Sequence, residues 1–346
     1  MSTPRVPVRS VRPIHPTSDD RVKHAHANVN GVKLHYVIGE PKSGNPRGTV
    51  LCIHGFPDMW YTWRYQIPIL LEMNLRVIAP DCLGYGGTSA PSSPEEFYSL
   101  KHNADTLAAL LSSLSIPTVT LLAHDWGSMI AWRLYNYHPH LISHIISLCV
   151  PYDPPHSNTP YLPLTDVVKK LPNFTYQIAL ADPQTLEDIS KDKNEVRRFL
   201  KAMYRGIGDG RGKAPGINVE KGMMDAVGDM PRGWIIGEEE LEWYVDTFWG
   251  VGMHGPLAYY KNRRRNWEDE QQLRDQMVHV PVLFIGATKD AALPPSMAAG
   301  QKRYIPGLTS KLVEASHWMV WEQTDEVNGI LKEWFETVVF SAKAKL

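Results

Sequence analysis

The chain has 346 residues, 43% of them hydrophobic and 21% charged, which is typical of one large globular domain or of a core with a substantial insertion. Its 36 Lys and Arg residues nearly balance its 37 Asp and Glu residues, so the net charge does not favour nucleic acid or an anionic membrane as a partner. No apolar run approaches the ~18–20 residues needed to span a bilayer, and the N-terminus lacks the apolar segment of a signal peptide.

The first 22 residues are polar, and we expect an arm that packs loosely on the domain. Residues 23–40 predict two strands joined by a hairpin turn at Asn30-Gly31. His24 and His26 alternate on the first strand, which is weak evidence for a pair of metal ligands and fits two partly exposed polar side chains better. No Cys/His spacing resembles a metal site, so the sequence predicts no metal and no other cofactor.

Short apolar runs then alternate with amphipathic segments. Strands are predicted at 48–55, 75–81, 118–124 and 141–150, and helices at 61–73, 99–114 and 126–137. Buried apolar strands separated by amphipathic helices predict an α/β fold, in which a mostly parallel sheet carries helices on both faces.

This alternation stops after Val150. A proline-rich segment follows, then about a hundred residues with helical patterns and a glycine-rich segment, 205–222, that we expect to be an exposed loop. Strands return at 280–287 and 310–316, with helices at 294–305 and 327–340. We therefore predict an N-terminal arm (residues 1–22), a core in two parts (23–151 and 276–346) and a helical cap (152–275) inserted between the two parts of the core.

The cysteines and the last tripeptide bear on the compartment. The three cysteines each lie in or beside an apolar run, and an odd number of buried cysteines suits a reducing compartment. Ala344-Lys345-Leu346 is close to the S-K-L address that the peroxisomal import receptor reads, and the basic end of a final helix explains it equally well. We expect a cytoplasmic or peroxisomal location.

The segment LLAHDWGSMIAW, residues 121–132, predicts a sharp turn from a strand into a helix with Asp125 at its apex. The small residues Ala123 and Gly127 flank the turn, as they must where a strand–turn–helix elbow projects its apex side chain above the sheet. A simple helix N-cap, a role that Asp often fills, explains the local sequence equally well.

Two later residues favour the catalytic interpretation. Asp290 follows one apolar strand and His317 follows the next, in the order nucleophile, acid, histidine that this kind of elbow requires. Phe56 lies in the loop after the strand at 48–55, where an oxyanion-hole N–H is expected, and Trp126 follows the apex and would supply the second N–H.

At this point the sequence resembles the soluble-type epoxide hydrolases of the α/β-hydrolase fold, over essentially everything after the arm. The motifs are HGFPDMWYTWRYQIP, GYGGTSAP, HDWGSMIAW, TYQ at 175–177, GPLAYYKNRRRNW at 255–267, KD at 289–290 and SHW at 316–318. The resemblance implies the catalytic residues Asp125, Asp290, His317, Tyr176 and Tyr260, and substrate contacts from Gln177, Trp126 and Phe56. Ala123 and Ser128 stand where glycines are usual, and both are small substitutions.

The resemblance also implies a reaction. A carboxylate is ionised at neutral pH and needs no base to attack a strained epoxide carbon. His317, oriented by Asp290, would then activate water against the ester on Asp125, and a vicinal diol would leave. The expected partners are a small apolar epoxide and water.

Three alternative functions use the same fold, of which the first stays open and the other two are disfavoured. A haloalkane dehalogenase shares the fold and the Asp nucleophile, and the Trp126 indole could bind its halide, but Phe56 stands where many such enzymes have a side-chain amide. A serine esterase is disfavoured because Ser128 lies three residues into the helix. A non-catalytic binding protein of the same fold is disfavoured because Asp125, Asp290 and His317 are all present.

Overall fold

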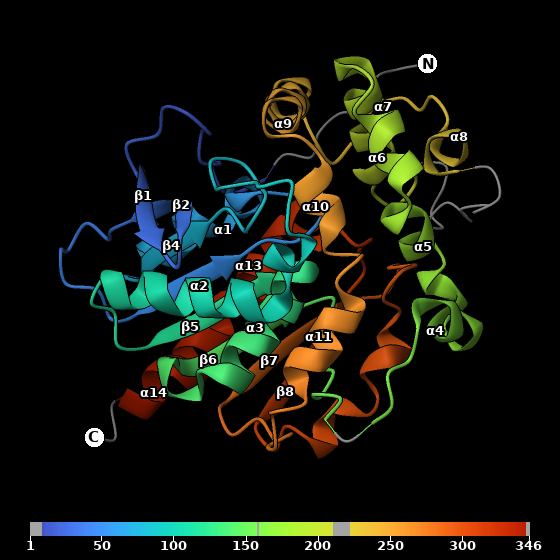
Figure 1. Ribbon diagram of the computed structural model, residues 1–346. Helices are drawn as coiled ribbons and strands as arrows, with labels where there is room; N and C mark the ends of the chain where they lie inside the picture. Colours follow the sequence, from blue (N-terminus) through green and yellow to red (C-terminus); the bar gives the residue numbers. More distant parts are fainter. Residues whose placement is uncertain (1–8, 158, 210–221, 344–346) are drawn as a thin grey trace.

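The computed structural model describes residues 9–157, 159–209 and 222–343 and is built around an eight-stranded sheet (Figure 1). The strand order is β1-β2-β4-β3-β5-β6-β7-β8. Neighbouring strands from β4 to β8 are parallel, whereas β2 pairs antiparallel with both β1 and β4. The strands are β1 (Lys23–Val29), β2 (Val32–Gly39), β3 (Thr49–Ile53), β4 (Arg76–Pro80), β5 (Val119–His124), β6 (Ile142–Leu148), β7 (Val282–Ala287) and β8 (Leu308–Val313).

The burial of each strand follows from its place in the sheet. Every residue of the central strands β5 and β7 is buried, because helices cover both faces, and both sequences are accordingly almost continuously apolar. The edge strand β1 reads KHAHANV and is exposed or half-buried except at Val29. The predicted fold class, a mostly parallel sheet with helices on both faces, is confirmed.

Two groups of helices enclose the sheet. In Figure 1 α2 and α3 lie against each other in front of the sheet, and α1 and α13 lie behind it. The side chain of Ser99 caps α2 by accepting a hydrogen bond from the His102 N–H. The helices of the core are α1 (Gln66–Glu72), α2 (Leu100–Ser113), α3 (Trp126–Tyr137), α12 (Met319–Glu322), α13 (Thr324–Trp334) and α14 (Phe340–Lys343), and the 3-10 and π segments are η1 (Trp60–Trp63), η2 (Glu95–Tyr98), η3 (Pro139–Leu141), η6 (Pro295–Ala298), η7 (Gln301–Arg303) and η8 (Phe335–Val339).

Some predicted helices differ from the observed ones. The helix expected at 294–305 is two short 3-10 turns, η6 and η7, on either side of Gly300. The helix expected at 61–73 is divided into η1 and α1. Proline and glycine disfavour a continuous helix, which accounts for the first difference.

The prediction of a loosely packed arm is wrong for the residues that the structure describes. Ile14 is fully buried, and the guanidinium of Arg9 donates to the carbonyl oxygens of Trp321 and Ile235 and to the hydroxyl of Tyr65. A polar segment can still pack firmly, because a single Arg with five N–H donors holds the chain through backbone carbonyls.

The chain between β6 and β7 is helical, and no strand occurs in its described part. Figure 1 shows α4 to α8 grouped on the side of the molecule away from β1. Of the glycine-rich segment, residues 205–209 form no helix or strand, and residues 210–221 lie outside the described residues, as does the C-terminal tripeptide 344–346. The cap helices are α4 (Leu164–Lys170), η4 (Pro172–Phe174), α5 (Tyr176–Ala181), α6 (Pro183–Ile189), α7 (Lys193–Met203), α8 (Met223–Val227), α9 (Glu238–Val251), α10 (His254–Ala258) and α11 (Arg263–Glu270). Among the described helices, none is long and apolar enough to span a membrane.

A buried carboxyl group joins the cap to the loop after β3. Asp58 is fully buried, and its Oδ1 accepts hydrogen bonds from the Tyr244 hydroxyl on α9, at 2.7 Å, and from the Met59 N–H, at 2.8 Å. Its Oδ2 has no hydrogen-bond partner among the described residues. Burial raises the pKa of Asp58 to about 7, although these hydrogen bonds oppose the shift. The folded protein therefore favours the protonated acid at this position.

This raised pKa predicts a pH-dependent stability. The stabilising contribution of Asp58 is complete below its unfolded pKa of 3.8 and is lost as the pH rises through about 7. Asp58→Asn, which stays neutral, should therefore gain stability relative to the parent by on the order of 2–3 kcal/mol between pH 5 and pH 9, in urea unfolding. Glu239→Gln, an exposed change on α9, is the control and should gain nothing. An equal difference at both pH values for Asp58→Asn would contradict the assignment.

Candidate active site

The turn between β5 and α3 places Asp125 at its apex with a positive φ of 52°, an unfavourable backbone conformation for a residue other than glycine. Two glycines make room for the turn. A Cβ on Gly55 would lie 2.5 Å from Asp125 Oδ1, and a Cβ on Gly127 would lie 2.2 Å from the Ile53 carbonyl oxygen. The Asp125 side chain makes no capping hydrogen bond to α3, so the N-cap alternative does not describe this residue.

The carboxylate of Asp125 faces two different partners. Its Oδ1 accepts a hydrogen bond of 2.8 Å from the Phe56 N–H, in the loop after β3. Its Oδ2 lies 3.4 Å from His317 Nε2. Oδ1 is therefore held by a backbone donor, whereas the His317 imidazole is the polar partner of Oδ2 among the residues that the structure describes.

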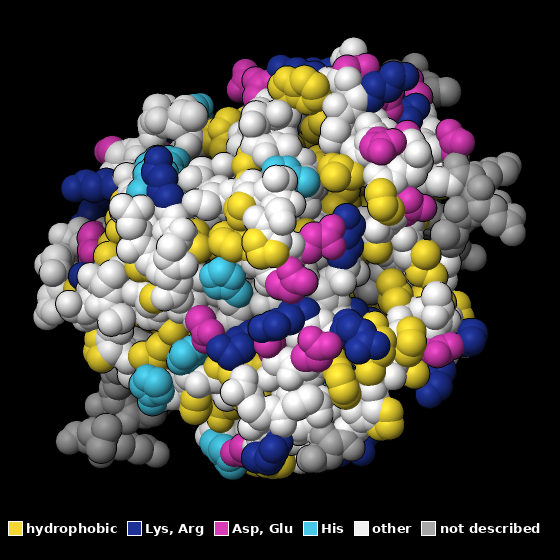
Figure 2. Space-filling model, in the orientation of Figure 1, with side chains coloured by type: hydrophobic (Ala, Val, Ile, Leu, Met, Phe, Trp, Pro, Cys, Tyr) yellow, Lys and Arg dark blue, Asp and Glu magenta, His cyan; other side chains and the backbone are white. Residues whose placement is uncertain are grey.

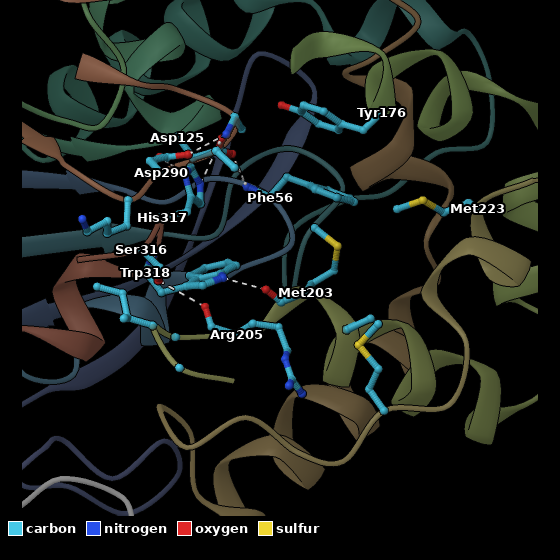
Figure 3. A pocket seen from close by; sticks show the side chains of 18 of the residues that line it. Phe56, Asp125, Tyr176, Met203, Arg205, Met223, Asp290, Ser316, His317 and Trp318 are labelled. Atoms are coloured by element: carbon cyan, nitrogen blue, oxygen red, sulfur yellow. Dashed lines mark hydrogen bonds and ion pairs between the residues drawn. The ribbon is translucent and has the colours of Figure 1, made fainter. Parts of the chain in front are cut away.

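His317 joins Asp125 to a second carboxylate. Its Nδ1 lies 2.7 Å from Asp290 Oδ2, and Figure 3 shows the imidazole between the two acids. The other oxygen of Asp290 accepts from the N–H groups of Ala292 and Leu293, at 2.9 and 3.0 Å, which fixes the carboxylate in the loop after β7. The three residues lie after β5, β7 and β8, so the carboxyl edge of the sheet brings them together.

The charges of this group depend on one another. Burial opposes protonation of His317, but Asp290 and Asp125 outweigh it and raise the pKa of the imidazole well above 6.5. Burial likewise opposes ionisation of Asp125, yet contacts with His317 hold the pKa of the carboxyl below its usual value. Asp125 is consequently an ionised carboxylate at neutral pH.

Two residues that the sequence analysis did not assign support the His317 backbone. His124 Nε2 lies 2.9 Å from the His317 carbonyl oxygen, and the Cys149 thiol donates to the same oxygen at 3.5 Å. Among the described residues these three side chains also form the one compact His/Cys group with metal-ligand spacing. Burial lowers the pKa of His124 to about 4 and raises that of the Cys149 thiol to about 12, so the thiol is protonated. His124 is the last residue of β5 and Cys149 directly follows β6, so both lie at the same edge of the sheet, and that position was the signal available in the sequence.

The cap brings two tyrosines to this carboxylate. Tyr176 begins α5, Tyr260 follows α10, and both line the same cavity as Asp125, with ring centroids 6.3 Å apart. Figure 3 shows the Tyr176 ring on the cap side of the cavity, with its hydroxyl toward Asp125. Burial, together with the negative charge of Asp125, raises the pKa of both phenols, so both are protonated donors at neutral pH.

The cavity has a volume of about 280 Å³ and lies between core and cap. Its cap side is largely apolar, which the sequence did not reveal because the packing of the cap helices decides which side chains face inward. The lining from residues 202–230 comprises Ala202, Met203, Arg205, Gly206, Ile207, Gly208, Met223 and Met230.

Some predicted contacts are not part of the cavity wall. Gln177 and Trp126 do not line the cavity: the Gln177 side chain hydrogen-bonds Tyr176, and the Trp126 ring packs edge-on against Tyr260 at 5.2 Å. Phe56 does line it. The Trp126 N–H makes no hydrogen bond to the Asp125 carboxylate in the described structure, so its oxyanion role stays a prediction.

Comparisons with known proteins agree with this geometry. A family model of the alpha/beta hydrolase fold matches residues 48–324. The chain is 35% identical to epoxide hydrolase srdG of Neurospora crassa, over 92% of this chain and 96% of that protein. It is 33% identical to bifunctional epoxide hydrolase 2 of Rattus norvegicus over 94% of its length, but it spans only 57% of that longer protein.

Solved structures give the same picture. Epoxide hydrolase A from Mycobacterium thermoresistibile superposes with a TM-score of 0.79 at 26% identity, covering 91% of this chain and 98% of that one. A mutant epoxide hydrolase from Vigna radiata gives a TM-score of 0.78 at 28% identity, covering 92% and 99%.

Proposed function

The chain belongs to the epoxide hydrolases of the α/β-hydrolase fold, and from this membership we propose that it opens a small apolar epoxide to a vicinal diol through an ester on Asp125. One observation carries the proposal. An ionised Asp125, the His317–Asp290 pair and two protonated cap phenols line a single, largely apolar cavity. Such a cavity admits an apolar ligand and presents few polar groups to it.

In the first half-reaction, Asp125 Oδ2 attacks an epoxide carbon. The new C–O bond forms as the ring C–O bond breaks, and the ring oxygen takes a proton from Tyr176 or Tyr260. Oδ1 keeps the hydrogen bond from the Phe56 N–H and becomes the carbonyl oxygen of the ester. The geometry thus divides the two oxygens of Asp125 between two tasks.

In the second half-reaction, His317 becomes the base. Alkylation turns Asp125 into a neutral ester and so removes one of the two anions that raise the pKa of His317. The imidazolium therefore gives up its proton, which restores the phenol used in ring opening. The neutral imidazole then takes a proton from water as the water attacks Asp125 Cγ, and the Phe56 N–H stabilises the oxyanion on Oδ1. When the diol leaves, the net proton released by ester hydrolysis stays on His317 and restores the imidazolium.

A haloalkane dehalogenase is the nearest alternative, and the contacts disfavour it. A departing halide needs N–H donors and no proton, but the Trp126 side chain is not part of the cavity wall. The hydroxyl groups that line the cavity from the cap are the phenols of Tyr176 and Tyr260, which suit an oxygen leaving group.

The proposal makes a direct isotopic prediction. A single turnover in oxygen-18 water, with enzyme in excess over a styrene-type epoxide, should give diol without label, because the new oxygen comes from Asp125. The label should appear in the Asp125 carboxylate on peptide mass analysis. Fully labelled first-turnover diol would mean direct attack by water and would overturn the covalent mechanism.

Removing the base should trap the ester. His317→Gln should alkylate and fail to hydrolyse, so intact-mass analysis should show the protein heavier by one substrate. The double variant with Asp125→Asn is the matched control and should form no adduct. Normal turnover by His317→Gln would remove His317 from the mechanism.

The cap phenols should control ring opening. A general acid is worth roughly 10²–10⁴ in rate, and each tyrosine can partly replace the other, so either Phe variant should slow alkylation modestly and the double variant by at least about 10². Because burial raises the pKa of both phenols, alkylation should persist to a pH above the value of about 10 of a free tyrosine. Stopped-flow single turnovers test both points, and Tyr161→Phe, outside the cavity, is the control. Parent-like alkylation by the double variant would refute the role of the phenols.

A further inference from the structure

Three histidines gather on one face of the β1–β2 hairpin, outside the catalytic cavity. His26 pairs directly with His35 in the antiparallel register, and His24 lies two residues before His26, so the three side chains project from the same face. The His35 ring centroid is 5.2 Å from that of His24 and 5.1 Å from that of His26. Figure 2 shows histidine side chains at the surface over this end of the sheet, where β1 is the edge strand.

Two of the imidazole nitrogens face each other. His24 Nδ1 lies 3.0 Å from His35 Nε2. The other nitrogen of His35, Nδ1, donates its N–H to Oδ2 of the buried Asp81 at 2.7 Å, so Nε2 is the nitrogen that His35 presents to His24. A carboxylate that holds one imidazole nitrogen while the other faces outward is the arrangement that orients metal-binding histidines.

Asp81 is itself fixed. It accepts hydrogen bonds of 3.0 Å from the N–H groups of Trp60 and Gly87, so it supports the His35 ring from a rigid position after β4. Its charge also favours a cation at the exposed side of His35, whereas the ammonium of Lys33 near His26 opposes one.

The main chain holds the two outer rings. The backbone of Pro16 hydrogen-bonds the His24 ring, and that of Gly87 hydrogen-bonds the His26 ring. Each ring is therefore oriented by a contact outside the cluster.

We propose that His24 and His35, with His26 as a third ligand after rotation of its exposed side chain, bind a divalent transition-metal cation such as Zn²⁺. Two nitrogens on a tetrahedral zinc lie about 3.3 Å apart for Zn–N bonds of ~2.0–2.1 Å. His24 and His35 would therefore separate by a few tenths of an ångström, and both rings would turn so that their nitrogens point to the shared ion. Ligands that are all imidazole suit Zn²⁺, Ni²⁺ or Cu²⁺ and not Mg²⁺ or Ca²⁺. The ion would join the two strands of the edge hairpin, with Asp81 in the loop after β4 holding His35 from behind, and takes no part in the epoxide chemistry.

The test is calorimetric titration of the intact protein with zinc chloride at pH 7.5. We expect one site in the parent and a loss of affinity of more than about tenfold in His24→Ala and in His26→Ala. Both changes are at exposed positions, and melting without zinc checks that the variants fold. His140→Ala, an exposed histidine away from the hairpin, is the matched control and should bind as the parent does.

Titration with Co²⁺ distinguishes the two histidine clusters. A nitrogen site should give visible ligand-field bands without thiolate charge transfer. A thiolate band would place the ion at Cys149 beside the catalytic histidine and would overturn the proposal. Parent-like zinc affinity in His24→Ala would also overturn the proposal. So would the absence of zinc binding by the parent, which would leave a proton shared between His24 and His35 as the reason for their short separation.

Discussion

The close contact between the turn at Asp125 and the loop after β3 is the constraint on which the site depends. A positive φ at a residue other than glycine costs on the order of 1–3 kcal/mol, and surrounding contacts must hold it. Here the Phe56 N–H holds the Asp125 carboxylate, and the absence of side chains at Gly55 and Gly127 lets the two segments meet. The same contact that makes the turn possible therefore aims an N–H at the atom where negative charge develops.

The catalytic histidine depends on a wider set of contacts. Asp290 fixes its ring, while His124 and Cys149 hold its backbone carbonyl. Its two neighbours reach the cap: the Ser316 hydroxyl donates to the Arg205 carbonyl, and the Trp318 indole donates to the Met203 carbonyl, as Figure 3 shows. The loop that carries the base is thus positioned jointly by the core and by the end of α7.

Much of this could be predicted from the sequence where local rules and fold topology agree. The run through Asp125 reads as a strand, a turn between small residues and a helix, and parallel strands bring Asp290 and His317 to the same edge. What escaped prediction depends on contacts between distant segments. The attachment of Arg9 uses backbone carbonyls, which leave no mark in the sequence, and the facing of Met203 or Met223 into the cavity depends on how short cap helices pack.

The separation of tasks between the two parts of the chain has an evolutionary consequence. Reactive groups come mostly from the sheet, whereas the shape of the cavity comes mostly from one contiguous insertion between β6 and β7. Substitution or recombination within that insertion can diversify the accepted substrates while inheritance of the sheet preserves the nucleophile and its base. Replacement of this insertion is constrained, because the new segment must still offer backbone carbonyls to the side chains of Ser316 and Trp318.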